Sequence, residues 1–243
     1  MNKGKDKATG FHVPTNRIFS EGNRLDDVYR EWFDSKTVSV TVNLQNSDDF
    51  LTPIEIAELT GAPKESTILV TRDDKVISFR VSNKIFSEDM FRYLVADSSG
   101  ISYYIKNVVL ALKEEYTKNG IGPRCVIKEI YAAAKLLDEL PIKAIKVSAV
   151  GDFESFRWKT DPMRGYYVWA RMGFDGKIPA AVRQKLSLKY RNLEFISSLM
   201  LDIEARKEWL EKGESVELEF DLASGSVSWR LLSQYMNEKG IEL

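Results

Sequence analysis

A strand, a helix and a second strand follow one another in the middle of the chain, and this order constrains the fold more than any other feature. Residues 101–112, Ile-Ser-Tyr-Tyr-Ile-Lys-Asn-Val-Val-Leu-Ala-Leu, have the length and apolar content of a buried strand. Residues 123–137 repeat apolar side chains at helical spacing and begin with a proline, which suits a first helical turn. Residues 142–150 form another strand, and 166–172 a short helix ended by Gly173. Such a β-α-β-α unit requires two parallel strands joined by a right-handed crossover.

The residues before this unit predict further strands and helices. Thr52, Pro53 and Glu55 have the cap, the first-turn proline and the acidic first turn of a helix that Gly61 and Pro63 stop. In chain order, we expect a helix at 24–33, a strand at 37–44, the helix after Thr52, hairpin strands at 67–71 and 75–81 joined at Asp73 and Asp74, and a connection at 87–100.

The last seventy or so residues continue the mixed pattern. They predict a helix at 193–210 with Gly213 past its end, a strand at 216–222 with one wet face, and a closing helix at 226–239. No internal repeat or low-complexity linker divides the chain. We therefore expect an α/β fold with a mixed α+β sheet: a flexible leader at 1–16 and one elaborated domain at 17–243, with its core at about 37–174 and a C-terminal extension at 175–243.

The residue types present exclude much of enzyme chemistry. Cys125 is the only cysteine and His12 the only histidine, so a Ser-His-Asp triad or a zinc site would need residues that the chain barely offers. Paired aspartates at 26–27, 48–49 and 73–74 are too scattered to predict a metal site. At helical spacing Cys125 is expected to face inward as a small apolar side chain.

Charge and hydropathy limit the partners. Thirty-five basic and 36 acidic residues give a formal net charge of −1, which does not indicate nucleic-acid binding. No run of about eighteen apolar residues predicts a membrane span, and the first residues lack the apolar stretch of a signal peptide. We expect a cytoplasmic protein without a membrane partner; a homo-oligomer is compatible with the sequence.

A glycine-containing turn between strand and helix is the best candidate for a binding site. Residues 112–122, Leu-Lys-Glu-Glu-Tyr-Thr-Lys-Asn-Gly-Ile-Gly, gather unpaired backbone N–H groups at the positive end of a helix dipole, as a phosphate-binding turn does. The two glycines could equally serve only the turn. A Walker loop would need Gly-Lys-Ser/Thr where this chain has Gly-Pro-Arg, and the dinucleotide motif would need glycine in place of Cys125.

Two motifs occur in order within residues 67–174. The first has an aliphatic residue, an aromatic residue and two small residues at Leu112, Tyr116, Gly120 and Gly122, and the second is Trp169-Ala-Arg-Met-Gly173-Phe174. This arrangement resembles the GNAT family of acyl-CoA-dependent N-acyltransferases, whose pattern is a hydrophobic strand, Gln/Arg-x-x-Gly-x-Gly/Ala, a helix, a strand and a helix closing on a Tyr-x-x-x-Gly-Phe-like motif. Thr117 stands in place of the family's Gln/Arg and Trp169 in place of its tyrosine.

The resemblance implies a GNAT-like fold and acetyl-CoA, or another acyl-CoA, as cofactor. Main-chain N–H groups of the turn would meet the pyrophosphate, with Lys118 and Arg124 supplying charge. The residues assigned to the cofactor are Leu112, Thr117, Lys118, Asn119, Gly120, Ile121, Gly122 and Arg124.

It also implies acyl transfer to an amine of a small molecule or protein. The base that accepts the amine's proton would be Glu114, Glu115 or Asp152, and the acid that protonates the thiolate would be Tyr166 or Tyr167. Tyr166 is favoured because it lies three residues before Trp169, on nearly the same helix face. The alternative is a catalytically inactive binding or interaction module of the same fold, which the Thr117 and Trp169 departures favour. A weaker alternative is an enzyme that modifies nucleic acid or uses another donor.

Overall fold

The chain folds around one mixed sheet, seen in a computed structural model that describes residues 26–44, 51–73, 75–157 and 164–242. The leader predicted at 1–16 lies outside the described residues. In the described part, seven strands follow one another across the sheet in chain order: β1 (Ser39–Asn43), β2 (Thr67–Asp73), β3 (Val76–Ser82), β4 (Met90–Ala96), β5 (Tyr103–Val109), β6 (Ile142–Ala149) and β7 (Val216–Asp221). The β1–β2 and β5–β6 pairs are parallel, and the other pairs are antiparallel. The α+β mixed-sheet class expected from the sequence is confirmed.

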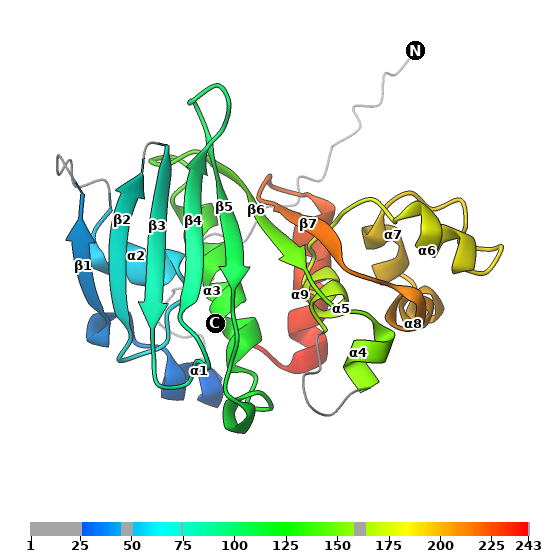
Figure 1. Ribbon diagram of the computed structural model, residues 1–243, viewed down its shortest axis with the longest axis horizontal. Helices are drawn as coiled ribbons and strands as arrows, with labels where there is room; N and C mark the ends of the chain where they lie inside the picture. The colour runs from blue at the N-terminus through cyan, green and yellow to red at the C-terminus, as the bar shows by residue number, and fades with distance from the viewer. Residues whose placement is uncertain (1–25, 45–50, 74, 158–163, 243) are drawn as a thin grey trace, which may run out of the picture.

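Helices lie between β1 and β2, between β5 and β6, between β6 and β7, before β1 and after β7 (Figure 1). They are α1 (Asp27–Trp32), α2 (Pro53–Leu59), α3 (Ile121–Lys135), α4 (Phe153–Arg157), α5 (Gly165–Arg171), α6 (Ala180–Lys185), α7 (Ile196–Met200), α8 (Ile203–Lys212) and α9 (Val227–Lys239), with 3-10 turns η1 (Ser35–Thr37) and η2 (Glu114–Tyr116). In Figure 1, α2 and α3 lie behind the sheet, and α6, α7 and α8 group beside its β7 edge. No helix within the described ranges combines the length and the apolar composition that a bilayer crossing requires.

One face of the sheet carries the core. Alternate residues of the strands are almost fully buried on it: Ile68, Val70, Phe79, Val81, Leu94, Ile105, Ile145, Val147, Leu218 and Phe220. The strand register places these residues on one face, where α2, α3, α5 and α9 pack. The ring of Phe220 contacts Phe174 and, in α9, Trp229, with centroids 5.4 and 5.3 Å apart. The opposite face leaves Leu69 and Val108 37% and 48% exposed.

Several predicted elements are confirmed. The strands around Asp73 form an antiparallel hairpin, and α2 begins with a complete capping box in which Thr52 and Glu55 satisfy each other's backbone N–H. Most importantly, β5 and β6 are adjacent and parallel, with α3 between them in the chain. Cys125 is fully buried, and burial raises the pKa of its thiol to about 12, so it acts as an apolar side chain.

Three predictions are wrong. The connection expected at 87–100 contains β4. Its inward-facing positions do not read as apolar in the sequence, because Arg92, a charged residue, occupies one of them and is nevertheless buried. The helix expected at 193–210 is two helices, α7 and α8, because Asp202 caps α8 by accepting hydrogen bonds from the N–H groups of Glu204 and Ala205. The strand expected at 101–112 is shorter, since β5 ends at Val109.

Candidate functional site

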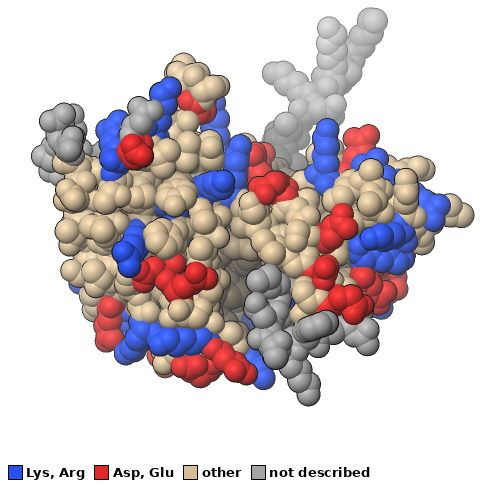
Figure 2. Space-filling model, viewed as in Figure 1, with Lys and Arg blue, Asp and Glu red and all other residues tan. Residues whose placement is uncertain are grey.

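The carboxyl ends of β5 and β6 diverge. Their pairing ends at Asn107 and Val147, after which β6 continues beside β7, while the chain after β5 runs beside the segment between β3 and β4, where Leu112 pairs with Phe86. Figure 2 shows the surface hollowed beside these strand ends. Backbone groups at the carboxyl ends of parallel strands are a common place for a ligand in α/β proteins.

A bulge in β5 accompanies the divergence. Phe91 pairs with Val109 and Arg92 with Asn107, so Val108 is an extra residue on β5. A bulge bends the strand that carries it and ends regular pairing. The bend therefore lies where β5 leaves β6.

The amino end of α3 follows this opening after one 3-10 turn. Gly120, with φ 70°, is the residue before the helix, and no side chain of the described residues caps the first turn. Lys118 and Asn119 are exposed beside it, and the Thr117 hydroxyl donates to the carbonyl of Glu114. Within the described part of the chain, the first N–H groups of α3 thus have no side-chain acceptor and can receive an anion.

Gly120 and Gly122 differ in what the fold requires of them. Gly120 has the left-handed conformation, and a Cβ there would lie 2.5 Å from Nη1 of Arg124. At Gly122 the backbone is helical, and a Cβ would meet only Leu112 Cδ1 at an ordinary 3.5 Å. Glycine inside a helix costs about 0.5–1 kcal/mol relative to alanine, so the fold itself does not account for Gly122.

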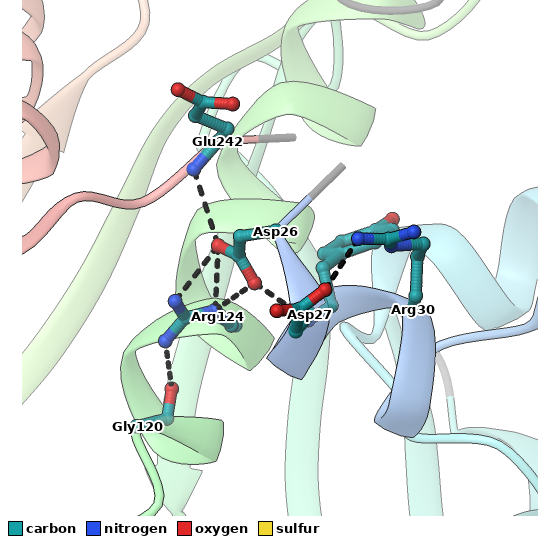
Figure 3. Close-up of polar contacts among 7 residues, drawn as sticks. Asp26, Asp27, Arg30, Gly120, Arg124 and Glu242 are labelled. Carbon is teal, nitrogen blue, oxygen red and sulfur yellow. Dashed lines mark hydrogen bonds and ion pairs between the residues drawn. The ribbon is translucent and has the colours of Figure 1, made fainter. Parts of the chain in front are cut away.

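The side chain of Arg124 is hydrogen-bonded to other groups of the protein (Figure 3). Its Nε and Nη2 donate to the carboxylate of Asp26 at 2.8–3.1 Å, and its Nη1 donates to the Gly120 carbonyl at 2.9 Å. Asp26 also accepts from the N–H groups of Tyr29 and Glu242. Burial alone would raise the pKa of Asp26, but these hydrogen bonds hold it below its usual value. With its donors used in this way, Arg124 orders the site rather than offering a free charge.

The hydroxyls of both tyrosines proposed as acids are hydrogen-bonded to other groups of the protein. Tyr166 is fully buried, and its hydroxyl donates to the carbonyl of Leu210 in α8 at 2.5 Å, on the side of α5 away from α3. Burial, with Asp152 nearby, raises the pKa of Tyr166 to about 12. The hydroxyl of Tyr167 accepts from Arg171, and the Trp169 ring packs edge-on against Phe174. The preference for Tyr166 as the acid therefore has no geometric support, because its proton is held by the protein.

The candidate bases are solvent-exposed carboxylates. Glu114 and Glu115 lie on η2, between the end of β5 and the amino end of α3. Asp152 caps the start of α4 by accepting from the Ser155 N–H at 2.7 Å, and that hydrogen bond lowers its pKa. The structure thus brings Glu114 and Glu115, but not Tyr166, to the predicted turn.

Two groups of site-forming residues could not be recognised in the sequence. One is Asp26, which binds Arg124 from 98 positions away. The other is a buried cluster of Arg92, Asn107 and Glu129 beneath the β5 bulge. The only signal for the cluster was a charged residue within otherwise apolar strand and helix patterns. Among the described residues, no three His, Cys, Asp or Glu side chains come together as metal ligands would.

No protein-family model, no curated protein and no solved structure matches this chain.

Proposed function

We propose that this protein is an acyl-CoA-dependent N-acyltransferase with a GNAT-like core. The observation that carries the proposal is Gly122, a helical glycine for which the fold has no need, in an uncapped first turn beside diverging parallel strands. A ligand that approaches the backbone closely explains both the missing side chain and the uncapped N–H groups.

In this proposal several of the described residues have separate roles in binding and catalysis. The N–H groups of Ile121 and Gly122 would bind the diphosphate, and the exposed Lys118 would add a positive charge. Leu112, adjacent to Gly122, would contact the apolar part of the pantetheine arm. When bound, acyl-CoA would supply the activated acyl group, and Glu114 or Glu115 would accept the proton of the amine, directly or through water.

A second candidate is a binding module that holds acyl-CoA without transferring its acyl group. The Tyr166 hydroxyl favours it, because that group is bound to Leu210 and cannot protonate a thiolate at the cleft. Trp169, at the family's tyrosine position, offers an indole N–H that is not a practical acid.

Calorimetry with CoA and acetyl-CoA tests the shared part of both candidates. We expect micromolar binding by the wild-type protein and at least tenfold weaker binding by Gly122→Val, whose unliganded thermal midpoint should stay within a few degrees of wild type. Absence of CoA binding by the wild type would contradict both candidates. Wild-type affinity in Gly122→Val would contradict the assignment of the turn.

A thiol-release assay separates the two candidates. Acetyl-CoA is incubated with the protein and a panel of small primary amines and lysine-containing peptides, and free CoA thiol is measured. Amine-dependent release supports the transferase, whereas CoA binding without release across the panel supports the binding module.

A further inference from the structure

Three buried polar side chains meet where β5 leaves β6. Arg92 of β4, Asn107 of β5 and Glu129 of α3 are at most 3% exposed. Arg92 Nε lies 3.1 Å from Glu129 Oε1, and Asn107 Nδ2 donates to Glu129 Oε2 at 2.8 Å. The cluster therefore connects both bulge-forming strands to the helix whose amino end forms the candidate site.

Arg92 also binds the backbone at the bulge. Its Nη1 donates to the carbonyl oxygens of Phe91 and Val109, each at 3.2 Å. These two residues pair across the strands on one side of the extra residue, Val108. A carbonyl freed by a bulge is costly to bury without a donor, so Arg92 stabilises the bent form of β5.

The cluster is poorly explained by stability alone. The free energy needed to remove two charges from water offsets much of their mutual attraction, and well-packed apolar residues often stabilise a core equally well. Arg92 Nη2 and Asn107 Oδ1 have no hydrogen-bond partner among the described residues. Burial also raises the pKa of Glu129, despite the opposing effect of Arg92. Apolar replacements would fill the space but would supply no donors to Phe91 and Val109.

We propose that Arg92, with Asn107 and Glu129, forms a positioning cluster that holds the β5 bulge and so keeps the β5 and β6 ends far enough apart to admit the extended arm of the ligand. This inference rests on the proposed function for the identity of that ligand, acyl-CoA. The cluster acts through the backbone of β5 and need not touch the ligand.

The test separates folding from positioning with Arg92→Met/Glu129→Met, which replaces the ion pair by unbranched apolar side chains. We expect a folded protein with a lowered thermal midpoint, faster amide hydrogen exchange at 108–110, and at least tenfold weaker CoA binding by calorimetry. The matched control is Lys128→Met, which removes another buried cation of α3 whose partners, Ser35 and Ala62, lie away from β5. Its CoA affinity should stay within twofold of wild type.

Arg92→Lys provides a second measurement if the double variant does not fold. A lysine keeps a cation, but its single ammonium cannot reproduce the guanidinium, whose Nε lies against Glu129 while its Nη1 donates to both carbonyls, so exchange at 108–110 should rise and CoA affinity should still fall severalfold. Unchanged exchange and affinity in a folded variant would overturn the positioning role. If wild type binds no CoA, the proposed function fails while the exchange measurement still decides whether the cluster holds the bulge.

Discussion

At the scale of single residues, Tyr166 shows how one hydrogen bond changes the interpretation of a site. Its place near the second motif made it a candidate acid, but its hydroxyl donates to Leu210, and Trp209 Nε1 donates to its backbone carbonyl. Gly213 lies against the ring, where a Cβ would come within 2.9 Å of it. Tyr166 thus joins α5 to α8, which is a structural role.

Replacing Tyr166 by phenylalanine should therefore affect stability and not transfer. Losing a hydroxyl donor to a buried carbonyl costs about 1 kcal/mol, so the urea midpoint should fall while any acyl-transfer rate stays within twofold of wild type. Tyr167→Phe is the control, because among the described residues its hydroxyl accepts from the side chain of Arg171 and contacts no backbone carbonyl. A rate reduced a hundredfold at unchanged stability would restore Tyr166 as a catalytic acid.

Among the helices and strands, the sequence predicted those whose start, end or pairing is specified by residues close together in the chain. The α2 capping box, the β2–β3 hairpin and the strand–turn–helix at β5 and α3 are of this kind. Strand β4 was missed because Arg92 interrupts its apolar pattern, and the residue that neutralises it, Glu129, is far along the chain in α3. Burial of a charge is decided by tertiary partners that no local window contains.

The candidate site was also predictable only where its signals lie close together in the sequence. The turn at 112–122 and the parallel strands around it follow from sequence order and crossover handedness. The ion pair between Arg124 and Asp26 does not follow from the sequence, because the two residues belong to different elements that only the fold brings together. Hydroxyl directions, such as that of Tyr166, depend in the same way on the packing of α5 against α8.

Helix α3 also buries Lys128, which makes stability depend on pH. Its Nζ donates to Ser35 Oγ and the Ala62 carbonyl, and burial lowers its pKa from 10.5 to about 8. Between these values the unfolded chain binds more protons, so stability should rise with pH by about 3 kcal/mol in total. Urea unfolding at pH 8 to 10.5 should show this rise in wild type relative to Lys128→Met. Parallel curves for the two proteins would contradict the shifted pKa.

At the scale of the whole molecule, the two ends of the described chain meet at α3. Asp26 precedes α1 and Glu242 follows α9, and each donates its backbone N–H to the other residue, one to a carbonyl and one to the carboxylate. The same carboxylate binds Arg124, whose side chain lies over Gly120 at the amino end of the helix (Figure 3). One ionised group therefore links both ends of the described chain to the candidate site.

Asp26→Asn should loosen all three segments together. Asparagine has one uncharged acceptor oxygen in place of the two carboxylate oxygens that bind the Tyr29 and Glu242 N–H groups and the nearly buried Arg124 guanidinium, so we expect a loss of roughly 2 kcal/mol of unfolding free energy. Amide exchange should rise at Tyr29 and Glu242 in one step, since a single carboxylate holds both N–H groups. Asp27→Asn makes the same charge change one residue away, at an exposed side chain that pairs with Arg30, and should cost less than about 0.5 kcal/mol. If the two variants were equally stable, or if exchange rose at Tyr29 alone, Asp26 would be an ordinary helix cap and the ends of the chain would be held to α3 by packing.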